Sequence, residues 1–184
     1  MVQRTVQVFG NDVFRFSGRR AYILPNRKRE NPMQYKYAAA DDMELLIRSR
    51  EETLRAVNRL PENYAFSEEF LEASREYFRE GDQTTVLALE DGRLAGCATL
   101  CYIDLMPTFS HPSGRRGHLM NVYTVPAFRR RGVGKQMVSM LIDEARDRGI
   151  TEISLDATEA GRPLYQALGF RDSGECMVLE LNPA

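Results

Sequence analysis

The chain has 184 residues, of which 43% are hydrophobic and 28% charged, so it can bury a sizeable core and is not disordered throughout. Its 25 Lys+Arg and 26 Asp+Glu give a formal net charge of -1, which excludes a uniformly basic nucleic-acid coat. Three cysteines without a CxxC pair argue against a disulfide framework, and two histidines outside any metal-ligand spacing argue against a zinc site. No stretch approaches the roughly 20 apolar residues of a membrane span. We therefore expect a cytoplasmic protein without a metal.

The first 32 residues differ in charge from the rest of the chain. They contain seven basic and two acidic residues, whereas the following 152 residues contain 18 basic and 24 acidic ones. This basic segment lacks the continuous apolar run of a secretory signal. We predict a basic, weakly packed N-terminal extension over residues 1–32 and one folded domain over residues 33–184, with an organelle transit peptide as an alternative for the extension.

Hydrophobic periodicity and turn residues predict alternating helices and strands after residue 32. The predicted elements are a strand over 34–37, helices over 43–57 and 67–78, strands over 84–89 and 93–103, a loop over 106–117, a strand over 118–125, a helix over 132–148, a strand over 151–157, a helix over 161–168 and closing strands from residue 170 onward. Asp91-Gly92 is a strong hairpin turn between two of the strands. This order predicts an α/β domain with a central mixed sheet.

The most informative stretch is Arg129-Arg130-Arg131-Gly132-Val133-Gly134-Lys135, where a strand leads through two glycines into an amphipathic helix. The first N–H groups of a helix have no intrahelical partner, and the helix dipole is positive there. Glycines let an anion approach the backbone closely. Residues 130–135 therefore predict a phosphate or pyrophosphate site. Gln136 excludes a Walker A loop, and Met137 excludes a Rossmann fingerprint.

The spacing Arg129-x-x-Gly132-x-Gly134 resembles the coenzyme-A-binding loop of the GNAT superfamily of N-acetyltransferases. A later block, with Leu164-Tyr165 followed by Gly169-Phe170, resembles a second motif of the same superfamily. Both blocks occur in the superfamily's order, and the resemblance covers residues 34–182. It implies a GNAT-like α/β fold with a central mixed, mostly antiparallel sheet that is flanked by helices and splayed between its two central strands.

The resemblance also implies acetyl-CoA as co-substrate, with no metal required. In the superfamily, backbone groups of the strand before the glycine loop pair with the pantetheine arm, and the loop binds the pyrophosphate. The residues that the resemblance places near the coenzyme are Tyr123, Thr124, Val125, Arg130, Arg131, Gly132, Val133, Gly134, Lys135, Thr158 and Arg162. Thr158 stands near the place of an asparagine that is common in relatives.

Three residues are catalytic candidates. Tyr165 matches a tyrosine that sits by the coenzyme sulfur in GNAT enzymes and protonates the departing thiolate. Asn121 stands where many relatives have an acidic base, and its amide cannot take a proton. Histidine is the side chain that ordinarily changes charge near neutral pH, so His118 is an alternative base, with Asp104 and Tyr123 as further candidates.

Two cysteines, Cys97 and Cys101, lie four residues apart on a predicted central strand, so they share one face of it. Free cysteine behaves as a small buried hydrophobe, which favours core packing. A covalent acyl-cysteine mechanism is the alternative, but no base stands near either residue in the sequence.

The resemblance thus implies an N-acetyltransferase that acts on an unidentified small-molecule or peptide amine by direct attack in a ternary complex. The acceptor is expected among the first two helices and the 106–117 loop. Acidic residues there favour a cationic acceptor; they are Glu51, Glu52, Glu62, Glu68 and Glu69. Dimers are frequent in the superfamily, but no interface is specified. The alternatives are a non-catalytic acyl-CoA-binding sensor and, against the net charge, a nucleic-acid or partner-binding module that uses Arg15 to Arg29, Arg115-Arg116 and Arg129 to Arg131.

Overall fold

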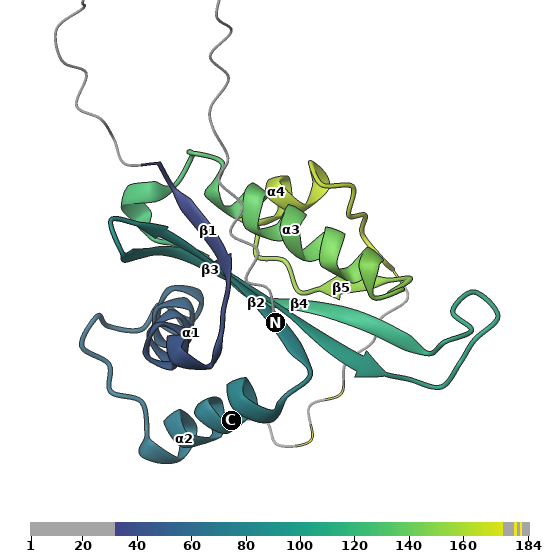
Figure 1. The fold of residues 1–184 in the computed structure, drawn as a ribbon, viewed down its shortest axis with the longest axis horizontal. Helices are drawn as coiled ribbons and strands as arrows, with labels where there is room; N and C mark the ends of the chain where they lie inside the picture. The colour runs from purple at the N-terminus through teal and green to yellow at the C-terminus, as the bar shows by residue number, and fades with distance from the viewer. Residues whose placement is uncertain (1–31, 175–178, 180, 182–184) are drawn as a thin grey trace, which may run out of the picture.

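The computed structural model describes residues 32–174, 179 and 181, and it shows one sheet with helices on both faces (Figure 1). Its helices and strands are β1 (Gln34–Tyr37), α1 (Met43–Asn58), α2 (Glu68–Glu80), β2 (Gln83–Glu90), β3 (Arg93–Asp104), β4 (Arg115–Thr124), α3 (Val133–Asp147), β5 (Ile153–Leu155) and α4 (Arg162–Gln166). One 3-10 turn, Ala40–Asp42, precedes α1, and another, Pro126–Phe128, precedes α3. The predicted extension lies outside the described residues up to residue 31.

The sheet has the strand order β1-β2-β3-β4-β5. Neighbours from β1 to β4 are antiparallel, and β5 is parallel to β4. The parallel pair needs a crossover connection, which α3 supplies. The predicted α/β fold with a mixed, mostly antiparallel sheet is therefore confirmed.

Several predicted boundaries differ from the structure. The loop predicted over 106–117 is shorter, because residues 115–117 belong to β4 and pair with residues 102–104 of β3. Gly117 fits tightly in that pairing, since a Cβ there would lie 2.9 Å from Leu100 Cδ1. The strand predicted over 151–157 shortens to β5, and the helix over 161–168 shortens to α4. Residues 170–174 form no strand, and most of the predicted closing strands lie outside the described residues.

The main core lies between α3 and one face of the sheet. Met137, Val138 and Leu141 of α3 are fully or almost fully buried there. They pack against alternate residues of the two central strands, and the largest of these are Val86 and Leu100. Burying a side chain of this size contributes about 1.5–3 kcal/mol. The predicted helix over 132–148 is thus the element that closes this face (Figure 1).

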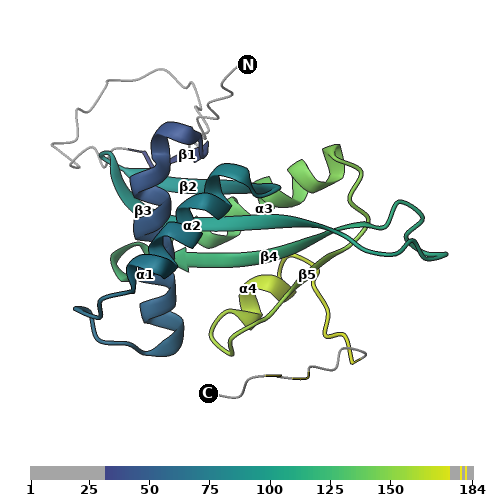
Figure 2. The ribbon, with the colours of Figure 1, turned by 90° about the horizontal axis from the view of Figure 1, so that it is seen from below.

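The opposite face is covered by α1 and α2, and it is less completely filled. Leu46 of α1 packs with Leu87 and Cys97 in a second, smaller cluster. By contrast, α2 buries none of its side chains, although Ser67 caps it by accepting a hydrogen bond from Phe70 N at 3.2 Å. In Figure 2, both helices cross the same face of the sheet. A loosely packed α2 leaves room between this helix and the strands.

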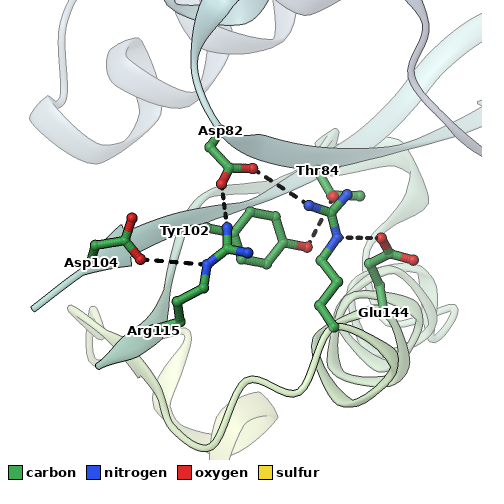
Figure 3. Close-up of polar contacts among 7 residues, drawn as sticks. Asp82, Thr84, Tyr102, Asp104, Arg115 and Glu144 are labelled. Carbon is green, nitrogen blue, oxygen red and sulfur yellow. Dashed lines mark hydrogen bonds and ion pairs between the residues drawn. The ribbon is translucent and has the colours of Figure 1, made fainter. Parts of the chain in front are cut away.

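A polar network ties the C-terminal end of α3 to the sheet (Figure 3). Asp82 accepts a hydrogen bond from Arg115 and lies 3.4 Å from Arg148 Nη1, so one carboxylate serves two arginines. The guanidinium carbons of these arginines lie 5.8 and 4.4 Å from the centroid of the Tyr102 ring. Glu144 accepts a hydrogen bond from Arg148 Nε at 2.7 Å. The network joins β2, β3, β4 and α3 at one end of the sheet.

Two classes of feature were not found in the described residues. No helix there is long and apolar enough to cross a bilayer. Nor do three or more His, Cys, Asp or Glu side chains gather into a group able to hold a metal ion over the same residues.

The shared carboxylate makes a testable contribution to stability. We expect Asp82→Asn to lower the free energy of unfolding by about 1 kcal/mol, because a surface ion pair contributes about 0.2–1 kcal/mol and Asp82 serves two partners. Urea denaturation measures this change. The matched control is Asp143→Asn, which removes one exposed pair with Arg146 and should cost less than about 0.5 kcal/mol. Equal losses would contradict a shared role for Asp82.

Candidate functional site

The sheet opens between β4 and β5. The two strands pair only over Gly117–Leu119 and Ile153–Leu155. Beyond Leu119, β4 continues to Thr124 with no strand beside it on that edge among the described residues (Figure 2). This is the splay expected between the two central strands. The exposed backbone edge of β4 suits an extended ligand that pairs as an additional strand.

The opening coincides with a β-bulge in β4. Cys97 pairs with Tyr123, whereas Thr99 pairs with Met120, so β4 carries one extra residue here. Asn121 has a φ of 54°, a left-handed conformation that asparagine adopts more readily than most residues. Two contacts hold the bulge: Cys97 Sγ donates to Asn121 O at 3.1 Å, and Asn121 Nδ2 donates to Ser49 Oγ at 3.3 Å.

A cavity of about 280 Å³ lies between α1, α2 and the bulged part of the sheet. Its walls are mostly apolar, and its lining residues are Arg50, Phe70, Ala73, Ser74, Tyr77, Phe78, Thr99, Cys101, Met120 and Asn121. The loose packing of α2 leaves this space open. The acceptor was expected among the first two helices, and the cavity lies there, although the 106–117 loop does not line it.

Among the residues that line the cavity, Arg50 is the charged one. It forms no ion pair with any carboxylate of the described residues, and burial lowers the pKa of its guanidinium. The acidic residues that follow it on α1 have other partners, since Glu51 pairs with Arg55 and Glu52 with Arg48. None of the five glutamates that favoured a cationic acceptor lines the cavity, whose charged residue is Arg50, and the cationic acceptor stays a prediction.

Asn121 has one buried polar atom without a partner. The residue is 7% exposed, and its Nδ2 atom donates to Ser49 Oγ, whereas its Oδ1 atom is buried without a hydrogen-bond donor among the described residues. A buried acceptor that lacks a donor costs about 1–3 kcal/mol, so the bulge carries this cost.

The start of α3 forms the other half of the site. Gly132 has a φ of 80°, and nothing lies within 4 Å of the position that its Cβ would take. The first hydrogen bond of the helix runs from Gln136 N to Gly132 O at 3.0 Å. The N–H groups of Val133, Gly134 and Lys135 therefore have no acceptor among the described residues, and they form a cradle for an anion.

The arginines before this helix have intramolecular partners. Arg129 Nε donates to Thr124 O at 3.0 Å, and Arg131 Nη2 donates to Glu90 at 2.6 Å. Arg130 is exposed and has a φ of 63°, so the chain turns sharply just before Gly132. Their backbone positions shape the loop, and the N–H groups at the helix start carry the anion site.

Tyr165 lies on α4, next to this helix start. The preceding residue, Leu164, reaches within 3.3 Å of the position that a Cβ would take at Gly134. The Tyr165 ring packs edge-on against Phe170, with centroids 5.9 Å apart. Burial raises the pKa of the Tyr165 phenol above its usual value of 10.0. The hydroxyl therefore stays protonated at neutral pH.

Two further residues of the predicted coenzyme set stabilise the local fold. Thr158 O accepts hydrogen bonds from Gly161 N and Arg162 N, both at 3.0 Å, which holds the turn before α4. Arg162 Nη1 donates to Asp172. The structure thus ties both side chains to the α4 segment.

His118 lies on β4 beside β5, outside the lining of the cavity. Its Nδ1 atom is 2.9 Å from Ser154 Oγ, and its Nε2 atom is 3.9 Å from Asp156 Oδ2. Asp104, another candidate base, lies at the far end of β3, 3.4 Å from Arg115 Nε. The cavity and the splay bring Asn121 and Tyr123 together, while His118 and Asp104 lie elsewhere.

Cys97 and Cys101 are both buried on the face of the sheet that α1 and α2 cover, as their spacing predicts. Burial raises the pKa of the Cys97 thiol to about 11 and also raises the pKa of Cys101. A thiol that stays protonated is a poor nucleophile. Cys97 instead supports the bulge through its hydrogen bond to Asn121 O.

Sequence reasoning missed Arg50 and Tyr77. The signal for Arg50 was present, because it stands four residues after Leu46 and three after Ile47, on the apolar side of α1. Tyr77 falls within the helix predicted over 67–78, where no site residue was expected, and it lines the cavity.

The basic patches that suggested nucleic-acid binding are largely neutralised within the described residues. Arg116 donates to Glu152 at 2.5 Å, and Arg115 donates to Asp82. Arg131 pairs with Glu90, whereas Arg129 and Arg130 form no ion pair in the described part of the chain, and the nucleic-acid alternative stays a prediction. The segment from Arg15 to Arg29 lies outside the described residues.

Comparison with known proteins gives one family. The family model described as Acetyltransferase (GNAT) family matches residues 49–170. A crystal structure of a predicted acetyltransferase with acetyl-CoA from Clostridium acetobutylicum superposes with a TM-score of 0.72 at 30% sequence identity, and the match covers 81% of this chain and 96% of that one.

Curated relatives give the same family over shorter segments. Glucosamine 6-phosphate N-acetyltransferase of Trypanosoma brucei brucei is 33% identical over 90 residues, which are 49% of this chain and 59% of the relative. Glucosamine 6-phosphate N-acetyltransferase 1 of Oryza sativa subsp. japonica is 30% identical over 112 residues, which are 59% of this chain and 68% of the relative. The chain thus spans little more than half the length of the trypanosomal protein.

The reactivity of the Cys97 thiol tests whether this residue is buried and protonated behind the bulge. With a pKa of about 11, Cys97 is a thiolate in roughly one molecule in 1,000 at pH 8. We expect iodoacetamide at that pH to leave Cys97 unmodified in the folded protein, as measured by peptide mapping. The same treatment in urea is the control and should alkylate Cys97 fully. Rapid alkylation of the folded protein at Cys97 would show an activated thiol and would contradict this assignment.

Proposed function

Since the chain belongs to the acetyltransferase (GNAT) family, we propose that it transfers the acetyl group of acetyl-CoA to the amine of a small acceptor. One observation carries the proposal: the open edge of β4 leads from an anion cradle at the start of α3 to a cavity behind the bulge at Asn121. This path has a place for a pyrophosphate, for an extended arm and for an acceptor.

Acetyl-CoA would bind along this path. Its pyrophosphate would accept hydrogen bonds from the N–H groups of Val133, Gly134 and Lys135. The space beside Gly132 is open, so the phosphates could approach these groups closely. Its pantetheine arm would pair with the backbone of Tyr123 to Val125, where β4 has no strand neighbour in the described part of the chain. The thioester would then lie near the bulge, where the acceptor cavity begins.

The chemistry is one acyl transfer within a ternary complex. The amine nitrogen attacks the thioester carbon, a C–N bond forms, and the C–S bond breaks. The nitrogen loses one proton, and the departing thiolate gains one, so the products are an amide and the free thiol. Holding both substrates in one site supplies the orientation that a bimolecular reaction lacks. The high pKa of Cys97 argues against a covalent acyl-cysteine route.

Tyr165 is the proposed general acid. Its phenol stays protonated because burial raises its pKa, and α4 packs directly against the helix start that would hold the pyrophosphate. A phenol near the sulfur can protonate the thiolate as the C–S bond breaks.

The attack of the amine depends on how the cavity orients the acceptor. Asn121 cannot accept a proton, and its Oδ1 atom is buried, so this residue is not the base. The cavity lining includes no carboxylate or imidazole, so the acceptor would react as its neutral amine, and the rate should rise with pH up to the pKa of that amine. The role of His118 as a base, acting through water, stays a prediction.

A non-catalytic acyl-CoA-binding sensor is the second candidate. It is favoured by the same absence of a basic residue from the cavity lining. A sensor would bind acetyl-CoA but release no thiol with any amine, so a thiol-release assay over a broad amine panel separates the two. Several relatives are glucosamine 6-phosphate N-acetyltransferases by name, which makes glucosamine 6-phosphate one member of that panel.

A substitution at Gly132 tests whether acetyl-CoA binds at the start of α3. We expect Gly132→Ala to reduce the thermal stabilisation by acetyl-CoA, because a methyl group would occupy the open space above the helix start. Saturation at about 100 times the dissociation constant adds about 2.7 kcal/mol, which is a shift of several degrees.

Gly149→Ala is the matched control for this variant. Gly149 also has a positive φ, of 70°, and open space around its Cβ position, but it lies at the other end of α3. Both variants should carry a similar strain cost, and only Gly132→Ala should lose the acetyl-CoA shift. An equal shift in both variants would place the pyrophosphate elsewhere.

The Tyr165→Phe variant tests whether Tyr165 is the proton donor to the departing thiolate. We expect Tyr165→Phe to lower kcat by about 100-fold or more at neutral pH, with little change in the KM for acetyl-CoA, because the ring packing remains and only the donor is lost. Tyr102→Phe removes a buried hydroxyl that bonds Thr84 at 3.0 Å, away from the cavity, and should cost stability without changing kcat. Unchanged turnover in Tyr165→Phe would exclude the assignment.

A further inference from the structure

The geometry points to an acceptor with one carboxylate beside its amine and an apolar body, which is the chemistry of an apolar α-amino acid. The carboxylate would pair with Arg50 inside the cavity, and the body would lie against its aromatic walls. This inference rests on the proposed acetyl transfer and adds to it the class of acceptor.

Arg50 supplies the first argument. Arg50 is half-buried, and removing part of a guanidinium from water is costly unless an anion pairs with it. No carboxylate of the described residues pairs with Arg50, and its acidic neighbours on α1 are paired with Arg48 and Arg55. An anion carried by the acceptor would complete the site, and it would recover part of the cost of burying Arg50.

The lining also limits the charge of that anion. Arg50 is the one cationic residue among the residues that line the cavity. A single planar guanidinium matches one carboxylate with two parallel hydrogen bonds. A phosphate dianion would carry a second negative charge with no further cation in the lining. The same positive charge repels a polyamine or a lysine side chain.

The walls define the body of the acceptor. Phe70, Phe78 and Met120 give the cavity its apolar surface. Two of its hydroxyl groups are already used, since Ser74 Oγ donates to Phe70 O at 2.8 Å and Thr99 Oγ1 lies 2.7 Å from Thr85 Oγ1. A sugar ring would bury several hydroxyl groups here without partners, at about 1–3 kcal/mol each. An aliphatic or aromatic side chain has no such cost.

The bulge at Asn121 sets where the other end of the acceptor lies. Asn121 lines the cavity and stands at the bulge where the thioester is proposed to lie. With its carboxylate on Arg50 and its body along the apolar walls, the acceptor would bring its α-amine to this end of the cavity, beside the thioester carbon. The products would be the N-acetylated amino acid and the free thiol, with the amine proton released and the thiolate protonated, as in the general reaction.

The first arm of the test compares acceptors. Thiol release from acetyl-CoA is measured with L-phenylalanine, L-leucine and L-methionine, each against its C-terminal amide, over a series of pH values, and kcat/KM is expressed per neutral amine. This correction is needed because the α-carboxylate raises the pKa of the adjacent amine above that of the amide. Once it is made, each pair differs in the carboxylate that Arg50 would bind. We expect at least one amino acid to exceed its amide in kcat/KM by about 10- to 100-fold, the range for a charge-assisted hydrogen bond. Amides that react as well as their acids would overturn the inference.

The second arm uses Arg50. Arg50→Met should lower kcat/KM for the preferred amino acid by about 10- to 100-fold and leave its amide nearly unchanged, because only the charge pair is lost. Arg50→Lys keeps the charge and should recover part of the loss. Arg48→Met is the matched control on the same helix, since Arg48 is exposed and pairs with Glu52 outside the cavity. An equal loss with acid and amide would mean that Arg50 is structural, and the inference would fall.

A binding measurement separates this inference from the proposed reaction. Thermal shift with acetyl-CoA shows that each variant is folded and binds the co-substrate. If no amine releases thiol, the proposed transfer fails; the cavity assignment then still holds if the same amino acids raise the melting temperature of the wild type but not of Arg50→Met. If none of them shifts the wild type or is acetylated, the inference is overturned.

Discussion

The site depends on one extra residue in β4. Asn121 occupies a left-handed conformation, and the resulting bulge bends the strand just beyond the point where its pairing with β5 ends. The bulge is held from behind by the Cys97 thiol and by Ser49 of α1, so its geometry is fixed by buried contacts rather than by a surface loop. Without the bend, β4 and β5 would continue side by side, and no edge would remain for an extended ligand.

The two faces of the sheet contribute differently to this arrangement. On one face, α3 fills the space completely, and its N-terminus projects the N–H groups of Val133 and Gly134 toward the open edge. On the other face, α2 buries none of its side chains, and a cavity remains. Rigid packing thus fixes the anion cradle, while the looser layer leaves room for an acceptor. The polar network at Asp82 lies away from the cavity and anchors α3 from its other end (Figure 3).

The anion cradle could be predicted from the sequence because its cause is local. Gly132 and Gly134 stand at a strand-to-helix turn, and the free N–H groups follow from the start of any helix. The cavity could not be predicted in the same way. Residues of α1 meet residues of β3 and β4 only after the strands adopt their register, and a single bulge changes which β4 residue faces them. Arg50 was therefore not among the predicted site residues, and the expectation of a cationic acceptor rested on the glutamates of the first two helices.

Charge illustrates why composition is a poor guide to a site. Four of the eight glutamates on α1 and α2 pair with arginines on their own helix, as Glu51 does with Arg55 and Glu68 with Arg75. Ion pairs near the surface are screened by water and project little field into a cavity. A half-buried guanidinium is screened much less, so Arg50 alone sets the local potential even in a chain of net charge -1. Selectivity for the acceptor would then arise from one unpaired cation, held in place by the helix that also supports the bulge.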